Sequence, residues 1–471
     1  MSLKVYNTLS REKEEFVPIH GNNVGMYVCG PTVYGYPHLG HAKSYISFDT
    51  IYRYLKFKGY NVKYVQNITD VGHLVGDGDE GESKVEKQAK IEKIDPYQIA
   101  YKYELEYFNC MDRLNVLRPD ISCRATGHII EIIDMVKTLI DKGFAYVTSE
   151  DNVYFDIEKF KGYGKLSNRT LDDTVSGERI TVADDKKRPE DFALWKKADK
   201  GHLMKWPSPW GEGYPGWHIE CSVMSKKYLG DTFDIHGGGM DNIFPHHDCE
   251  IAQSECANGC DFVKYFIHNN LVTVNGQKMG KSLGNFITLP DLFNKYDPVV
   301  IRFYTLLSHY RKPTDFSDDK IEEAKRSFES ISKAYIKVSR LSLENVNLDE
   351  EIESIKNKFI EAMDDDFNTA LAISYLYELV KIINTTNDVN KLVNIANLFN
   401  DVIIPILGIE FNNNLNDSSN NLEDELIKYI IELRKNARSE KNFELSDKIR
   451  DHLLSLGVTL KDSREGTTYE K

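Results

Sequence analysis

Apolar and polar positions along the first 70 residues predict a strand, a helix and a second strand. Residues 24–29 (Val-Gly-Met-Tyr-Val-Cys) form a short apolar run that ends at a Gly-Pro pair. From Ala42 to Lys58, large apolar side chains recur at steps of three and four residues, which is typical of an amphipathic helix. Residues 61–68 then alternate as a strand does. A strand–helix–strand unit predicts an α/β fold built on a parallel sheet.

The pattern changes further along the chain and predicts several domains. Residues 116–200 carry shorter, mixed elements and suggest an insertion between two halves of the sheet, residues 1–115 and 201–316. Long charged helices with apolar stripes predict a helical bundle over 317–410. An asparagine-rich polar stretch, 411–421, predicts a linker before a small charged unit, 422–471.

Composition narrows the class of protein. The chain has 471 residues, 41% of them hydrophobic, which suits a globular protein of two or more domains. It contains no apolar run long enough to span a membrane and no apolar leader, so we expect a cytoplasmic protein. Its seven scattered cysteines argue against a disulfide framework and leave metal binding or catalysis open. The net charge of -14 does not favour a nucleic-acid partner, although a local basic face would suffice for one.

A histidine pair follows the first predicted strand. His38, Gly40 and His41 stand where the first helix begins, and backbone N–H groups, the helix dipole and imidazole donors at such a place can hold phosphates. Taken alone, the segment fits a capped helix with surface histidines equally well.

A second candidate phosphate site lies late in the chain. Lys278-Met-Gly-Lys281-Ser282 follows an Asn-Gly turn and places two cations and a hydroxyl on one loop. Such a loop can neutralise a polyphosphate during an in-line displacement. The alternative is an ordinary solvated basic turn.

Four further residues suggest a metal site. Cys29 ends the first strand and Cys221 lies in a Gly-Trp-His-Ile-Glu-Cys segment. His246 and Glu250 are four residues apart and share a face if they lie on a helix. Two thiolates, an imidazole and a carboxylate suit tetrahedral zinc. The alternative for scattered cysteines is burial as small apolar side chains, and His247 competes for the imidazole position.

The histidine pair and the lysine loop together resemble the two signatures of class I aminoacyl-tRNA synthetases. The cysteine, histidine and glutamate set narrows the resemblance to cysteinyl-tRNA synthetases, and the likeness runs from Tyr6-Asn-Thr-Leu9 to Glu465-Gly-Thr-Thr468. It implies a Rossmann-like catalytic domain with an insertion, a helical bundle and a C-terminal anticodon-binding unit.

The resemblance also implies roles for individual residues. Cys29, Cys221, His246 and Glu250 fall on the zinc-ligand positions of the family, and Cys249, Cys256 and Cys260 are then structural. Thr32 and Trp217 fall near the substrate cysteine, although packing explains Trp217 equally well. Positions implied for ATP are Gly40, Gly238, Asp241, Lys281 and Ser282, and those implied for catalysis are His38, His41, Lys278 and Lys281.

The implied reaction is ATP-dependent activation of L-cysteine followed by transfer to tRNA(Cys), with one Zn²⁺ per chain, Mg²⁺ accompanying ATP, and zinc selecting the thiolate over serine. Arg434, Arg438 and Phe443 are candidate tRNA contacts, although an ordinary solvated helix face explains the arginines equally well. We expect a monomer.

Three positions depart from the family pattern: Gly280 where serine is usual, the segment Val71-Gly-His73, and Phe443 where tryptophan is frequent. The sequence assigns no role to His73. Alternative functions are the cysteine:amino-sugar ligase of mycothiol synthesis and a non-catalytic tRNA-binding paralogue.

Overall fold

A computed structural model describes residues 2–76, 78–79, 81–170, 185–280, 284–343, 346–411, 418–463 and 466–470. The chain separates into two compact units, Met1–Phe411 and Asn412–Lys471. In the described residues, no helix is both long and apolar enough to cross a membrane.

A five-stranded parallel sheet lies at the centre of the first unit. Its strands are β12 (Val263–Asn269), β11 (Phe233–Gly239), β3 (Asn23–Val28), β4 (Asn61–Ile68) and β5 (Ile121–Arg124), in that order. Most of their side chains are buried, as both faces of a covered parallel sheet require. The predicted strands and the helix between them are confirmed.

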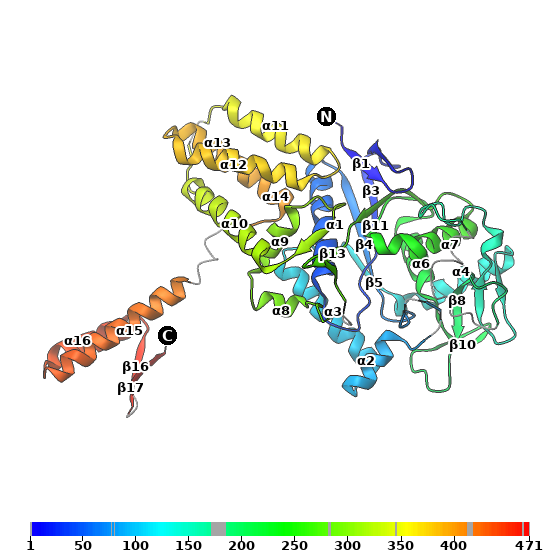
Figure 1. The fold of residues 1–471 in the computed structure, drawn as a ribbon, viewed down its shortest axis with the longest axis horizontal. Helices are drawn as coiled ribbons and strands as arrows, with labels where there is room; N and C mark the ends of the chain where they lie inside the picture. The colour runs from blue at the N-terminus through cyan, green and yellow to red at the C-terminus, as the bar shows by residue number, and fades with distance from the viewer. Residues whose placement is uncertain are drawn as a thin grey trace. The chain divides into compact units, whose positions relative to one another are not determined.

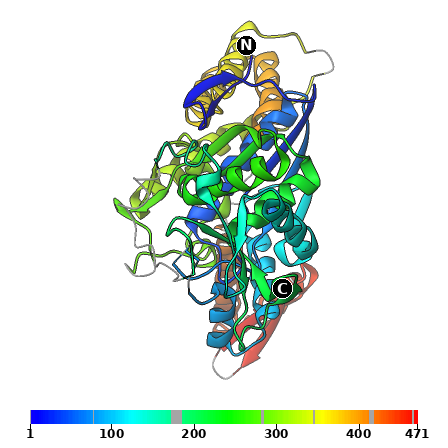
Figure 2. The ribbon, with the colours of Figure 1, turned by 90° about the vertical axis from the view of Figure 1, so that its right-hand side faces the viewer.

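Helices cover both faces of this sheet. Figure 1 shows α1 (Leu39–Phe57) on one side of the sheet and α6 (Trp217–Leu229) with α7 (Asp248–Asn258) on the other. In Figure 2 the side that carries α6 and α7, coloured green, faces the viewer. The remaining helices between β4 and β6 are α2 (Lys84–Glu92), α3 (Pro96–Arg113) and α4 (Ile129–Asp141). A short hairpin, β1 (Lys4–Asn7) with β2 (Glu12–Glu15), precedes the sheet.

An antiparallel sheet interrupts the parallel one. Its order is β6 (Ala145–Val147), β7 (Val153–Phe155), β8 (Phe192–Lys197), β10 (Gly211–Pro215) and β9 (Trp206–Ser208). One apolar cluster that includes Trp195, Ile219 and Cys249 joins this sheet to α4, α6 and α7. The insertion is therefore packed against the helices that carry Cys221 and Glu250.

The strands around the lysine loop form a small sheet of their own. β13 (Val272–Val274) pairs with β14 (Gln277–Lys278) and with β15 (Thr314–Phe316). Asn275 and Gly276, both at positive φ, form the two-residue turn of this hairpin, as Asn-Gly pairs commonly do. α8 (Leu289–Phe293) and α9 (Pro298–Leu306) follow.

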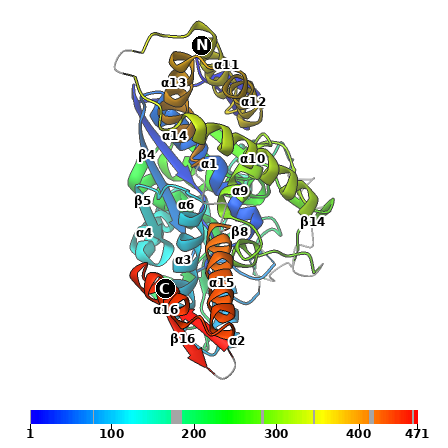
Figure 3. The same ribbon diagram turned by 90° about the vertical axis from the view of Figure 1, so that its left-hand side faces the viewer.

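The predicted helical bundle is confirmed. Figure 3 shows its helices packed together: α10 (Asp318–Val338), α11 (Glu350–Asp364), α12 (Thr369–Thr385), α13 (Val389–Leu398) and α14 (Ile404–Leu407). Ser317, Asp349, Asn368 and Asp388 each cap the following helix with a side-chain oxygen, so the helix starts follow from local sequence.

The second unit contains α15 (Ser418–Ser439), α16 (Phe443–Ser455) and the hairpin of β16 (Thr459–Ser463) with β17 (Gly466–Glu470). Its small core includes Ile427, Leu453 and Val458. The domain limits taken from the sequence stay predictions.

Candidate active site

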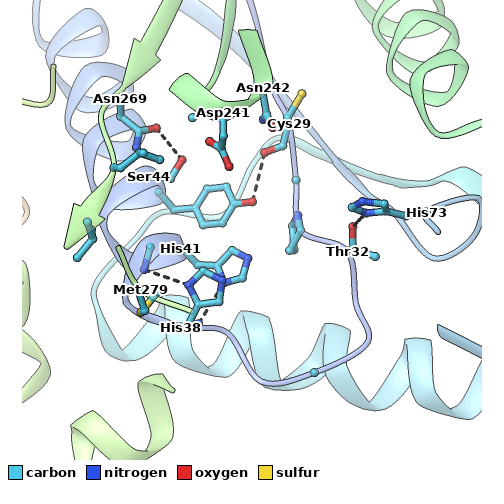
Figure 4. Close-up of a pocket in the computed structure, with 18 of the residues that line it drawn as sticks. Cys29, Thr32, His38, His41, Ser44, His73, Asp241, Asn242, Asn269 and Met279 are labelled. Carbon is cyan, nitrogen blue, oxygen red and sulfur yellow. Dashed lines mark hydrogen bonds between the residues drawn. The ribbon is translucent and has the colours of Figure 1, made fainter. Parts of the chain in front are cut away.

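A cavity of ≈ 370 Å³ opens beside the carboxyl ends of β3, β11 and β12. Ligands of open α/β sheets commonly bind at this edge. Of the residues predicted from sequence, the cavity is lined by Cys29, Thr32, His38, Gly40, His41, Trp217, Asp241 and Lys278. Figure 4 shows Cys29, Thr32, His38, His41 and Asp241 around this space. Residues far apart in the sequence of the first unit therefore share one cavity.

The two histidines are held by backbone N–H groups at the start of α1. The Gly40 N–H donates to His38 Nδ1 at 3.1 Å, and the His38 N–H donates to His41 Nδ1 at 3.0 Å. Because Nδ1 accepts in both neutral rings, Nε2 carries the proton in both. Burial and the neighbouring His38 hold the pKa of His41 well below its ordinary value. The pair can therefore donate two N–H bonds to an anion.

Glycine is required at position 40 because the His38 ring lies close to the backbone there. A Cβ there would lie 2.9 Å from His38 Cε1. A side chain would therefore displace the imidazole that caps the helix.

The lysine loop is described only in part. Lys278 lies in β14, is exposed, and lines the cavity together with Met279. The Gly280 N–H donates to Asn285 Oδ1 at 2.9 Å. The predicted positions Lys281 and Ser282 lie outside the described residues.

Asp241 and Gly238 lie at the end of β11. Asp241 lines the cavity and is exposed, whereas Gly238 is buried. A Cβ on Gly238 would lie 2.9 Å from His247 Cε1, so glycine is needed for packing against that ring.

The structure brings the four predicted metal ligands together. One donor atom from each of Cys29, Cys221, His246 and Glu250 lies within 4.8 Å of the others, and all four residues are buried. The Cys29 and Cys221 sulfurs are 4.0 Å apart, and His246 Nε2 is 3.0 Å from Glu250 Oε1. Such a mixed sulfur, nitrogen and oxygen set fits zinc. Cys29 alone of the four also lines the cavity, so it joins the donor cluster to the cavity.

A second donor set overlaps the first. Cys29, His236, His247 and Glu250 meet the same distance limit. His236 Nε2 is 2.8 Å from Glu250 Oε2, and His247 Nε2 is 3.3 Å from Cys29 Sγ. The sequence raised His247 as a competitor but missed His236, which no spacing rule links to Glu250. The first set is the better fit to zinc because it has two thiols.

Charges within the cluster shift its pKa values strongly. Burial raises the pKa of the Cys29 thiol, and Cys221 raises it further. For Cys221, burial is outweighed by hydrogen bonds from Cys29 and His246, which lower its pKa to about 6. For His246, burial opposes the shift, yet the Glu250 carboxylate raises its pKa to about 10. For Glu250, burial again opposes the shift, yet His236 and His246 lower its pKa to about 2.

Trp217 forms one wall of the cavity between two imidazoles. Its ring stacks on His73 with centroids 3.8 Å apart and an angle of 9°. Its ring also stacks on His246 at 4.4 Å. Thr32 Oγ1 is 2.6 Å from His73 Nδ1 (Figure 4). Tyr34, Lys84, Asn242, Asn269, Asn270 and Phe286 also line the cavity, and no sequence motif singled them out.

The other predicted residues lie elsewhere. Cys249 and Cys256 are buried in the apolar cluster of the insertion, and Cys260 is exposed. In the second unit, Arg438 is exposed and Phe443 is 60% exposed, but Arg434 is buried.

Comparison with known proteins gives the family. Residues 15–326 match the model for the class I (C) tRNA synthetase catalytic domain, and residues 358–412 match the DALR domain. The cysteine–tRNA ligase of Chlorobaculum tepidum is 51% identical, with 100% of this chain and 99% of that protein covered. That of Bacteroides fragilis is 46% identical, with 99% of each covered.

Solved structures support the fold. Mycobacterium tuberculosis methionyl-tRNA synthetase bound to methionyl-adenylate has a TM-score of 0.60 and 13% identity, over 82% of this chain and 92% of that one. The chain therefore belongs to the cysteine–tRNA ligase family of class I aminoacyl-tRNA synthetases.

Proposed function

We propose that the chain activates L-cysteine with ATP and transfers it to tRNA(Cys). The observation that carries this proposal is the position of Cys29, which lies in the buried metal-donor cluster and also lines the cavity with His38, His41 and Lys278. A thiol-selecting position and a phosphate-binding position are thus parts of one site.

The first step is attack of the substrate carboxylate on the α-phosphorus of ATP. The P–O bond to the β-phosphate breaks, and pyrophosphate leaves. No side chain acts as nucleophile, so catalysis rests on positioning and charge stabilisation. His38 and His41 donate Nε2–H bonds to phosphate oxygens, and Lys278 and Lys281 neutralise the departing pyrophosphate. Gly40, Gly238, Asp241 and Ser282 are the proposed ATP contacts.

Cys29, Cys221, His246 and Glu250 would hold the zinc ion. Bound there, zinc supplies a soft Lewis acid that prefers the substrate thiolate to the hydroxyl of serine. The side-chain wall formed by Trp217 then orients the rest of the amino acid. A pocket that filled space alone would separate such similar substrates only weakly.

In the second step, a ribose hydroxyl at the 3′ end of tRNA attacks the adenylate carbonyl and AMP leaves. The helical bundle and the unit 412–471 are the proposed tRNA-binding parts. Arg438 and Phe443, which are exposed, are the candidate contacts, whereas the buried Arg434 is not. Exposed Phe443 suits stacking on a base. Mg²⁺ bound to ATP, a monomeric state and a cytoplasmic location remain predictions from the sequence.

The test is pyrophosphate–ATP exchange with cysteine and with serine, on protein of measured zinc content. We expect exchange with cysteine alone and about one zinc per chain. Charging of tRNA(Cys), compared with transfer to an amino sugar, then separates the proposed acceptor from the mycothiol-type alternative. Folded, zinc-loaded protein without exchange would refute the activity and favour a non-catalytic paralogue.

A further inference from the structure

The segment between β4 and α2 forms one wall of the cavity. His73 and Lys84 both line the cavity and pair at the base of a loop, where the Lys84 N–H donates to the His73 carbonyl at 3.0 Å. One residue further into the loop, Leu74 and Ser83 form a bridge. The base of this loop is therefore fixed by its own backbone.

The far part of the loop is anchored to the insertion. Lys186 Nζ is 2.7 Å from Asp79 Oδ2, and the Ala193 N–H donates to the same carboxylate at 3.1 Å. The lysine side chain is 4% exposed and the aspartate 16%, so this ion pair is largely shielded from solvent. The contacts at the base of the loop and those at its far part thus hold His73 in place.

Gly72 allows the segment to approach α6. Its φ is +79°, and a Cβ there would lie 2.6 Å from Glu220 Oε1 and 2.8 Å from the Pro215 carbonyl oxygen. Any other residue would move His73 away from Trp217.

His73 uses both ring nitrogens and one ring face. Its Nε2 is 2.7 Å from Lys84 Nζ, and its Nδ1 is 2.6 Å from Thr32 Oγ1. The ring face lies on Trp217. The imidazole, 8% exposed, therefore joins Lys84 to a hydroxyl that lines the substrate cavity.

The direction of these hydrogen bonds follows from the donor chemistry. A lysine ammonium has three N–H donors and no acceptor, so His73 Nε2 accepts from Lys84. The neutral ring then carries its proton on Nδ1 and donates it to Thr32 Oγ1. Because that oxygen accepts from His73, the Thr32 O–H is directed elsewhere.

We infer that Lys84 and His73 are positioning residues that orient the Thr32 hydroxyl as a donor to the carboxylate of the amino-acid substrate. The Thr32 O–H can donate to a carboxylate oxygen, whereas the substrate ammonium has no lone pair that could accept it. This inference rests on the proposed function, since it concerns the amino acid bound at that site.

The first experiment measures the KM for cysteine and for ATP in pyrophosphate exchange. Lys84→Met removes the donor that sets the direction, and we expect the cysteine KM to rise about ten-fold, the effect of one net hydrogen bond to a charged group. The ATP KM stays unchanged, and Lys84→Arg, which keeps a donor-only cation, restores part of the loss. Lys87→Met, on an exposed residue of the same helix, is the matched control.

A double-mutant cycle tests the connection through His73. Thr32→Val should weaken cysteine binding to a similar extent, and adding Lys84→Met to it should have no further effect. Additive losses, or an equal rise in the ATP KM, would overturn the inference.

Competing ligands separate the carboxylate from the ammonium. 3-Mercaptopropionate keeps the thiol and carboxylate, whereas cysteamine keeps the thiol and ammonium. Lys84→Met should weaken inhibition by the first about ten-fold and leave the second unchanged; the reverse result would overturn the inference. Absence of exchange by the unmodified protein would refute the proposed function, whereas normal exchange with unaffected variants would refute only the role of Lys84 and His73.

Discussion

The shifted pKa values of the metal-donor cluster predict how zinc binding depends on pH. The perturbation is removal of the metal with a chelator, followed by its return at a series of pH values. Metal ligands bind in their deprotonated forms, so zinc must displace every proton that the empty cluster holds. The number of protons released therefore reports which residues bind the metal.

The expected number follows from the four donors. At pH 7.5 the Cys29 thiol, whose pKa is raised, holds one proton, and His246, whose pKa is about 10, holds another. Cys221 and Glu250, whose pKa values are about 6 and about 2, hold none. We therefore expect about two protons released per zinc, and an apparent affinity that rises roughly 100-fold per pH unit between about pH 7 and 9.

Titration calorimetry in buffers of different ionisation enthalpy measures the proton number directly. His246→Asn removes one ligand of the first donor set and should weaken zinc binding strongly. His247→Asn, the adjacent histidine, is the control: its pKa is held low by burial and by His236, so the release of about two protons should persist. A variant pattern in which His247→Asn abolishes binding and His246→Asn does not would refute the first donor set and favour the second.

Three other predictions test parts of the fold that serve the site. Gly40→Ala places a Cβ 2.9 Å from His38 Cε1, so the kcat/KM of pyrophosphate exchange should fall about 100-fold. Gly127→Ala, whose Cβ meets nothing within 4 Å, is the control and should leave kcat/KM unchanged; equal values for the two variants would contradict the role of His38. Deleting residues 412–471, a separate compact unit, should reduce tRNA charging at least about ten-fold more than exchange, and equal losses in a folded protein would contradict the division of labour. Burial lowers the pKa of Lys43 to about 7, so between about pH 7 and 10 the folded state binds fewer protons than the unfolded state, and the free energy of unfolding rises with pH. Lys43→Met should flatten that rise, measured by urea unfolding at pH 7 and pH 9.5, and an unchanged slope would contradict the pKa shift.

The parts of the site that local sequence dictates were predictable. The first strand, α1 and β4 follow from periodicity, and their order places Cys29 and His38 at the carboxyl edge of the sheet. His246 and Glu250 meet because they are four residues apart. Cys221, by contrast, was a candidate ligand that only the family resemblance distinguished from a buried structural cysteine, since no spacing rule joins a residue of α6 to the end of β3.

Residues that meet through tertiary packing were not predictable. His236 of β11 reaches Glu250 of α7 only in the folded chain, and a glycine-rich strand carries no signal of that contact. His73 was visible as a departure from the family, but its role depends on the turn at Gly72 and on packing against Trp217. Each is a contact between elements far apart in sequence.

The C-terminal unit shows that a charge cluster is a weaker guide than helical period. The basic residues that gather around Arg434 in the sequence predict a tRNA contact there. Yet Arg434 lies seven residues after Ile427 in α15, so the two share one face of the helix, and each is only 5% exposed. Arg438 is exposed on the same helix. Apolar periodicity thus assigns Arg434 to the core of the small unit, and Arg438→Ala is the more informative substitution for measuring loss of tRNA affinity.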